Sequence, residues 1–238
     1  MKTLKYIALS CIFSFAGLFH GFSIQHNYGL PVLTGVAGFG LDAVGGRDGR
    51  VIIVNNLNKD GSGSLAEALN AEGPRIIVFE VAGVIDLQGK PLRIKNPFVT
   101  IAGQTAPYPG ITLIEGGLYV ATHEVIIQHL KVRPGDANRE KRSGWEVDGI
   151  STGVGAYNVV IDHCSCTWAT DENLSASGPR FLGDTLDDWR RNTSHRITIS
   201  NCIISQSLSL STHSEIEHSK GSLIHDNTTE ILIYAVIS

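Results

Sequence analysis

A short apolar motif of the form V/I-x-I recurs along this chain and constrains its fold more than any other feature. Five copies occur, at residues 99–101, 125–127, 159–161, 197–199 and 231–233, and successive copies begin 26, 34, 38 and 34 residues apart. Such irregular spacing is typical of a β-solenoid, whose turns and inserted loops vary in length from coil to coil. A β-sandwich also has many short strands, but it would not explain an aligned motif. We therefore expect an all-β chain that forms a parallel β-helix from about Gly38 onward.

Further short β-forming runs, separated by Pro and Gly, fill the chain around these motifs. The predicted strands are Val51–Val54, Arg75–Val81, Val84–Leu87, Leu92–Ile94, Phe98–Ala102, Ile111–Ile114, Leu118–Val120, Val125–Val132, Val159–Cys164, Ile197–Ile204 and Ile231–Ile237. One short helical pattern, Ser64–Leu69, precedes most of them. We expect this helix to cap the N-terminal end of the strand stack, because an uncovered end would expose unpaired strand edges.

The aligned motifs also place four residues in one column, each three positions after the last isoleucine of its motif. These residues are Leu130, Cys164, Cys202 and Val236. Neighbouring coils are about 4.8 Å apart, a separation within the Cα range of a disulfide. Cys164 and Cys202 therefore form either a disulfide or two buried thiols that act as small apolar residues. Cys166 lies on the same face as Cys164 by alternation, so no single pairing is fixed.

Acidic residues gather in the stretch from Trp145 to Ser175, which contains no Lys or Arg. The five acids are Glu146, Asp148, Asp162, Asp171 and Glu172. Strand alternation puts Glu146 and Asp148 on one face of an extended segment, and Asp171 and Ser175 also share a face. Carboxylates brought together from separate extended segments suit a hard cation such as calcium. Solvated loop acids are the plain alternative, which spacing alone does not exclude.

Residues 158–175 read N-V-V-I-D-H-C-S-C-T-W-A-T-D-E-N-L-S. This run resembles the N-V-I-I-D-H-C-S-x-S-W-A-T-D-E-x-L-S signature of family 1 pectate lyases, most closely the branch that includes pectate trisaccharide-lyases. The run A-G-F-G…G-G-R-D-G-R-V-I-I-V-N-N-L-N-K-D-G-S-G-S-L, within residues 37–65, resembles an N-terminal motif of the same branch. The resemblance implies a right-handed, pectin-lyase-like β-helix. It also implies calcium-assisted β-elimination of de-esterified pectin, with polygalacturonate as the substrate.

The same resemblance implies roles for individual residues. Calcium ligands would include Asp148 and Asp171, with Glu172 and Glu146 as further candidates, and the family's remaining ligand position falls on Ser175. The segment around I-I-S-Q-S-L (203–208) and H-S-K-G (218–221) resembles a family segment whose lysine contacts a substrate carboxylate, which here is Lys220. We expect three histidines at the rim or in structural roles, and two further residues that hold the adjoining turns by hydrogen bonds. The histidines are His213, His218 and His225, and the other two residues are Asp162 and His163.

The chemistry of β-elimination needs a base as well as a cation. A uronate C5–H lies next to a carboxylate, so its removal builds an enediolate-like charge that a bridging cation withdraws. In the family, an R-N-P-R-like segment after a strand like 230–238 supplies the arginine that takes this proton. No R-x-P-R pattern occurs in the 238 residues. We therefore expect domain 22–238 to be incomplete at its C-terminus, with the catalytic arginine beyond residue 238. Expressed alone, it should have little or no lyase activity.

The N-terminal residues 1–21 resemble a secretory signal peptide. Lys2 and Lys5 precede the apolar run Tyr6–Phe19, which is short for a membrane span, although an uncleaved anchor remains open. We expect a protein that is secreted to the extracellular space or the periplasm, with no membrane association once mature.

Composition narrows the class of partner. The chain has a net charge of −4 and is 42% hydrophobic, which supports one domain with a sizeable core. Its mild acidity disfavours nucleic acid as a partner, and we expect a monomer. The loop Arg133–Gly144 is basic and would favour a polyanionic sugar beside the acidic stretch.

Two rival functions remain open on the sequence. One is a polygalacturonase-type glycoside hydrolase on the same fold, which needs two carboxylates that flank the scissile bond. The G-H-G motif of that family is absent. The other is a non-catalytic β-solenoid that binds carbohydrate. Unsaturated oligogalacturonides, formed from polygalacturonate, would distinguish a lyase from both.

Overall fold

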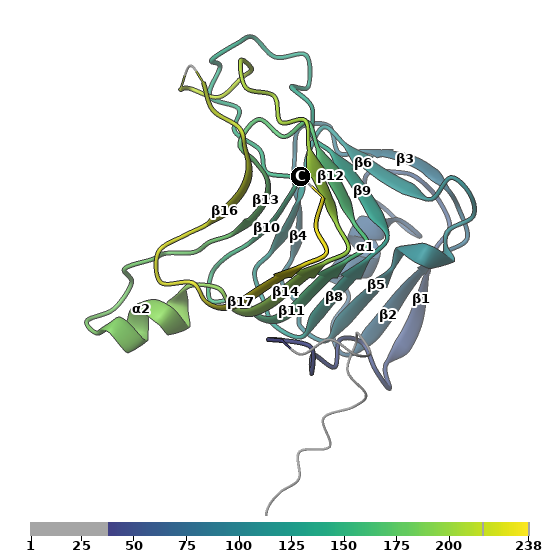
Figure 1. The fold of residues 1–238 in the computed structure, drawn as a ribbon. Coiled ribbons are helices and arrows are strands. Elements are labelled where there is room, and N and C mark those ends of the chain that lie inside the picture. Colours follow the sequence, from purple (N-terminus) through teal and green to yellow (C-terminus); the bar gives the residue numbers. More distant parts are fainter. Residues whose placement is uncertain (1–37, 216, 238) are drawn as a thin grey trace, which may run out of the picture.

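A computed structural model describes residues 38–215 and 217–237, so the predicted signal peptide lies outside the described residues. The chain is a right-handed parallel β-helix whose coils each pass through three sheets (Figure 1). Sheet A has seven strands: β1 (Arg50–Val54), β2 (Arg75–Phe79), β5 (Val99–Ala102), β8 (Val125–Gln128), β11 (Tyr157–Asp162), β14 (His195–Ser200) and β17 (Thr229–Tyr234). Sheet B comprises β3 (Gly83–Asp86), β6 (Ile111–Ile114), β9 (Leu130–Arg133), β12 (Ser165–Thr167) and β15 (Ile203–Ser205). Sheet C comprises β4 (Leu92–Ile94), β7 (Leu118–Val120), β10 (Ile150–Thr152), β13 (Glu172–Ala176) and β16 (Lys220–Ile224).

The V/I-x-I motifs pair in register as the sequence predicts. In sheet A, Val99 lies opposite Val125, which lies opposite Val159, and the column continues through Ile197 and Ile231. The first and last motif residues point into the core, because the side chains of a strand alternate between its two faces. Stacked apolar columns of this kind bury a continuous core that no single coil could bury alone.

The predicted column of Leu130, Cys164, Cys202 and Val236 is also confirmed by the register of sheet B. Cys164, Cys166 and Cys202 are buried free thiols, so the disulfide alternative does not hold. Burial raises the pKa of Cys166 well above its ordinary value, which keeps this thiol protonated at neutral pH. The cysteines here are packing residues.

Two predicted strands are each two strands in the structure, and a third runs into the same kind of corner. Val125–Val132 divides into β8 and β9, Ile197–Ile204 divides into β14 and β15, and Val159–Cys164 overlaps β11 and ends before β12. The corner residues are His129, His163 and Asn201, with φ of 55°, 52° and 52°. A single residue in the left-handed region turns the chain from sheet A to sheet B. Apolar residues on both sides of this corner make the sequence resemble one longer strand.

Sheet C is where the strand prediction was least complete, because β10, β13 and β16 were not predicted as strands. Their sequences are I-S-T, E-N-L-S-A and K-G-S-L-I. In β10 and β13, Ile150 and Leu174 occupy the paired positions that pack on the core. Most of the remaining residues are small or polar, and they give no apolar alternation to detect.

Helix α1 (Leu65–Asn70) confirms the predicted cap, with Leu65, Ala68 and Leu69 buried. The Ser64 hydroxyl accepts a hydrogen bond from the backbone N–H of Glu67, which satisfies a free donor of the first turn. At the other end, the fully buried Arg75 donates to the carbonyl oxygens of Ala68 and Leu69 at 3.1 and 2.9 Å. A cation at a helix C-terminus is electrostatically favourable.

The second helix, α2 (Leu186–Asn192), was not predicted from the sequence. Thr185 forms a capping box with Asp188, and Arg190 and Arg191 occupy the last turn. None of the helix residues is buried, so no apolar stripe marked it in the sequence. Within the described residues, neither helix is long and apolar enough to cross a membrane.

Candidate metal and substrate site

Sheet C brings three predicted acidic residues together. Asp148 precedes β10, Asp171 precedes β13, and Glu172 is the first residue of β13. One carboxylate oxygen from each residue lies within 4.8 Å of the other two. We call Asp148, Asp171 and Glu172 the acidic group. Parallel pairing of β10 with β13 creates it, since the two strand starts lie side by side.

Asp148 is held by donors from the neighbouring coil. Its Oδ1 accepts a hydrogen bond from the backbone N–H of Glu172 at 3.0 Å, and its Oδ2 accepts one from the Ser175 hydroxyl at 3.0 Å. Gly117 lies against its backbone, where a Cβ atom would approach the Asp148 carbonyl oxygen to 1.9 Å. The Asp148 carboxylate is therefore fixed before any cation arrives.

The acidic group carries more negative charge than its surroundings balance. Burial, together with Asp171 and Asp148, raises the pKa of Glu172 to about 9. Burial and then Asp171 raise the pKa of Asp148 as well, against a backbone hydrogen bond that lowers it. Within the described residues, the ion pairs of this group involve histidine and no lysine or arginine.

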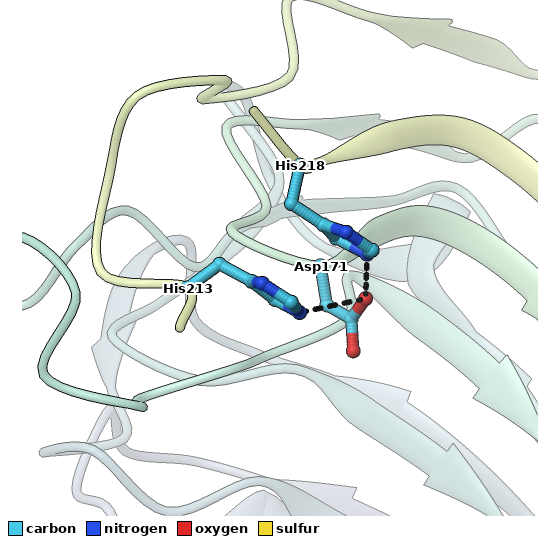
Figure 2. Close-up of side chains that lie close together, drawn as sticks. All are labelled: Asp171, His213 and His218. Carbon is cyan, nitrogen blue, oxygen red and sulfur yellow. Dashed lines mark hydrogen bonds and ion pairs between the residues drawn. The ribbon is translucent and has the colours of Figure 1, made fainter. Parts of the chain in front are cut away.

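Two histidines, His213 and His218, lie beside Asp171 of the acidic group (Figure 2). The rings of His213 and His218 stack with centroids 3.6 Å apart and planes 5° apart. His218 Nε2 lies 2.9 Å from Asp171 Oδ1, and His213 Nε2 lies 3.9 Å from the same oxygen. Both imidazoles thus point their Nε2 atoms at one carboxylate.

His213 can donate a hydrogen bond from Nε2. The Nδ1 atom of His213 accepts a hydrogen bond from the backbone N–H of Glu215 at 3.0 Å, so its ring proton sits on Nε2. One ring nitrogen of each histidine and one oxygen of Asp171 also lie within 4.8 Å of one another, so these three residues form a second group that could hold a metal ion. The rim or structural role expected for His213 and His218 stays a prediction.

Two other predicted site residues lie at the edge of the acidic group. Glu146 is exposed, accepts a hydrogen bond from the backbone N–H of Ser214 at 3.2 Å, and lies 3.6 Å from His213 Nε2. Hydrogen bonds from Ser214 lower the pKa of Glu146. Lys220 is exposed at the start of β16, opposite Glu172 in the register, and its backbone N–H donates to the Asp171 carbonyl at 3.1 Å.

The residues of the acidic group fit a hard divalent cation. They offer several carboxylate oxygens at the starts of β10 and β13, and the raised pKa of Glu172 reflects charge that a cation would offset. Ser175, at the fourth position implied by the resemblance, is buried and donates its hydroxyl to Asp148.

A groove of about 390 Å³ extends from the acidic group across β7 toward β4. Its walls include Arg93, Tyr119 and Trp145, together with Asp148 and Asp171. None of the first three was a predicted site residue. Alternation in the predicted strands Leu92–Ile94 and Leu118–Val120 places Arg93 and Tyr119 outward, and this was the available signal.

Asp162 and His163 form hydrogen bonds at the corner between sheets A and B, as predicted. Asp162 accepts hydrogen bonds from Ser200 Oγ at 2.7 Å and Asn201 Nδ2 at 3.0 Å, and it lies 2.8 Å from His163 Nδ1. His225, the third histidine considered, lies 2.6 Å from the Ser177 hydroxyl.

Comparison with known proteins gives consistent relatives, although no protein-family model matches the sequence. The chain is 37% identical over 214 residues to a "Probable pectate lyase C" of Aspergillus terreus, covering 90% of this chain and 43% of that protein. It is 39% identical over 186 residues to a "Probable pectate lyase C" of Emericella nidulans, covering 78% of this chain and 38% of that protein. A "Probable pectate lyase 18" of Solanum lycopersicum is 30% identical over 158 residues, or 58% of this chain and 37% of that protein.

A solved structure supports the fold. The crystal structure of Jun a 1, the major allergen from cedar pollen, matches with a TM-score of 0.53 at 18% identity. The match covers 85% of this chain and 69% of that one. This chain spans about two-fifths of the length of these curated relatives. The chain forms three sheets of parallel strands, and it is 37% or more identical to several proteins named "Probable pectate lyase C". This chain is therefore a relative of the pectate lyases.

Proposed function

We propose that this chain acts as a calcium-dependent pectate lyase on de-esterified polygalacturonate, by β-elimination. The acidic group carries the proposal, because three carboxylate oxygens lie within 4.8 Å of one another at the starts of β10 and β13. Raised pKa values of Asp148 and Glu172 support it, since they mark negative charge that the described residues leave unbalanced.

Each residue of the site has a distinct proposed part. Asp148, Asp171 and Glu172 hold the cation, and Glu146 is a further candidate at the rim. When bound, calcium would withdraw the negative charge that develops on the substrate carboxylate as the C5 proton leaves. The exposed ammonium group of Lys220 binds a substrate carboxylate as a point charge. Hydrogen bonding by His218 holds the Asp171 carboxylate in place.

The proton acceptor is not assigned to a residue of this chain. The sequence contains no R-x-P-R pattern. Calcium-dependent binding of polygalacturonate is therefore the first readout of the proposal, and formation of unsaturated product is the second.

The experiment incubates the full chain with polygalacturonate, with calcium or with EDTA. We expect binding that EDTA abolishes, and any product should absorb in the ultraviolet because β-elimination leaves a double bond. Asp148→Asn should lose calcium-dependent binding, whereas Asp60→Asn, an exposed control on a loop, should retain it. New reducing ends without ultraviolet absorbance would indicate hydrolysis and contradict the proposal, as would binding that is indifferent to calcium.

We further propose that residues 1–21 are removed, and that the protein is then secreted and acts as a monomer on the polysaccharide. Support comes from the sequence pattern of residues 1–21 and from the pectate-lyase relatives. Sequencing the N-terminus of protein recovered from the medium or periplasm tests the cleavage, and light scattering tests the monomer.

A further inference from the structure

Two arginines stacked on aromatic rings lie beside the groove that leads away from the acidic group. The Arg93 guanidinium lies 4.6 Å from the ring centroid of Tyr119, and the Arg139 guanidinium lies 5.3 Å from that of Trp145. Arg93, Tyr119 and Trp145 line the same groove as Asp148 and Asp171. The site as proposed above uses neither pair.

The register of sheet C fixes how far Arg93 lies from the acidic group. Arg93 lies opposite Tyr119, and Tyr119 lies opposite Ser151 of β10, the strand that Asp148 precedes. Arg93 is thus two strands from the strand that carries the acidic group's first residue. At about 4.8 Å per strand spacing, this separation is about 10 Å along the helix axis.

Both guanidinium groups are free to bind an anion. Arg93 and Arg139 are exposed, and within the described residues the ion pairs formed by arginine involve neither of them. A guanidinium presents a planar fork that matches a carboxylate in a bidentate pair. Stacking on Tyr119 limits the freedom of the Arg93 side chain, so less entropy is lost when an anion binds.

The ligand that fits is an extended polyanion with one carboxylate in each repeat. One pyranose unit advances such a chain by a length similar to one strand spacing of about 4.8 Å. We propose that Arg93, held by Tyr119, binds the carboxylate of a uronate about two residues along the polysaccharide from the uronate at the acidic group. Arg139 and Trp145 form a second wall of this subsite. The inference rests on the proposed function and extends it to substrate length and to recognition of unesterified residues.

A carboxylate at this position is the feature that Arg93 recognises. A methyl ester removes the negative charge and leaves an acceptor that pairs weakly with a guanidinium. Polygalacturonate should therefore depend on Arg93, whereas highly methyl-esterified pectin should not. Digalacturonate should also be insensitive, because it is too short to reach from the acidic group to Arg93.

The test measures binding to the full chain, with calcium present, by titration calorimetry. The probes are digalacturonate, hexagalacturonate and polygalacturonate. Arg93→Gln should weaken hexagalacturonate and polygalacturonate binding about tenfold, the effect of losing one charge-assisted pair. It should leave digalacturonate and calcium binding unchanged. The matched control is Arg50→Gln, which removes an exposed arginine from β1 of sheet A and should have no effect.

The outcomes separate the subsite from the proposed function. If Arg93→Gln binds all three probes with affinities within twofold of the wild type, the subsite proposal is overturned and the proposed function is not. Equal losses on digalacturonate and hexagalacturonate would also overturn it, because Arg93 would then act at the acidic group itself. Absence of calcium-dependent binding by the wild type would overturn both. Arg93→Lys should retain part of the affinity, since it keeps the charge without the planar fork.

Discussion

Buried carboxylates lie in two parts of this molecule, and the surrounding residues balance their negative charge in one part but not in the other. Asp162, 2% exposed at the corner between sheets A and B, meets donors on both of its oxygens. Burial by itself would raise its pKa, but hydrogen bonds from four side chains lower the pKa overall: those of Asn201, His163, Ser200 and Gln128. Asp162 is thus satisfied by the protein alone.

The acidic group on sheet C has the opposite balance. Burial and neighbouring carboxylates raise the pKa of Glu172 to about 9, and Asp148 is shifted in the same direction. The described residues offer it histidines and a few donors, but no lysine or arginine ion pair. Burial of a carboxylate therefore does not by itself identify a binding site. Negative charge that the protein leaves unbalanced does identify one, because a partner from outside the chain can balance it.

Removal of the satisfied carboxylate should have the largest effect on folding. Asp162→Ala leaves the buried Ser200 hydroxyl and the Asn201 amide without their acceptor, so we expect a loss of about 3 kcal/mol in the free energy of unfolding. Urea unfolding measures it. A loss below about 1 kcal/mol would show that this network contributes little to stability, and it would contradict the claim that the protein alone satisfies Asp162.

The acidic group should make calcium-free protein less stable as pH rises. The pKa of Glu172 is about 9 in the folded chain, against an ordinary value of 4.5, so between these values the folded state holds one proton more than the unfolded state. The free energy of unfolding therefore falls as pH rises from about 4.5 to about 9. Calcium should reduce this slope, because it takes the place of the proton.

Glu172→Gln isolates this contribution, since it keeps the side-chain shape and removes the charge. We expect the variant to be more stable than the wild type at mildly alkaline pH without calcium. The gain should be on the order of 1 kcal/mol, allowing for the solvent that still screens the group. The two proteins should converge near pH 4. Parallel stability curves for the two across this range would contradict the raised pKa.

The smallest effect belongs to a single donor of the satisfied network. Ser200→Ala removes one of four hydrogen-bonding side chains around Asp162 and should cost about 1 kcal/mol in the free energy of unfolding. Calcium affinity should not change, because Ser200 lies on sheet A and the acidic group on sheet C. An altered calcium affinity in this variant would show that the two regions are coupled.

The sequence predicted the core of the fold because sheet A repeats an apolar motif in register. It predicted much less of sheet C, where β13 begins with two consecutive polar residues, Glu172 and Asn173, that break the apolar alternation. The corner residues His129 and His163 were read as strand interior, since their left-handed backbone leaves no mark in the side-chain pattern. Helix α2 was missed because its stability comes from caps rather than burial.

The candidate site divides in a similar way. Asp148, Asp171 and Glu172 were predicted from one acidic stretch and the family resemblance, and the sheet places them together. Arg93 and Tyr119 could not be associated with them, because their relation depends on the register of β4, β7 and β10. The stacking of His213 on His218 depends on a loop whose path has no periodic signal.

The most direct test of the account is a calorimetric titration of calcium into the wild type, Asp148→Asn and Asp162→Asn, all confirmed as folded. Calcium should bind the wild type and Asp162→Asn with similar affinity, and Asp148→Asn should bind at least about tenfold more weakly, because the affinity of such sites follows the charge of their ligands. Wild-type affinity in Asp148→Asn, or a loss confined to Asp162→Asn, would contradict the claim that the unbalanced acidic group is the cation site.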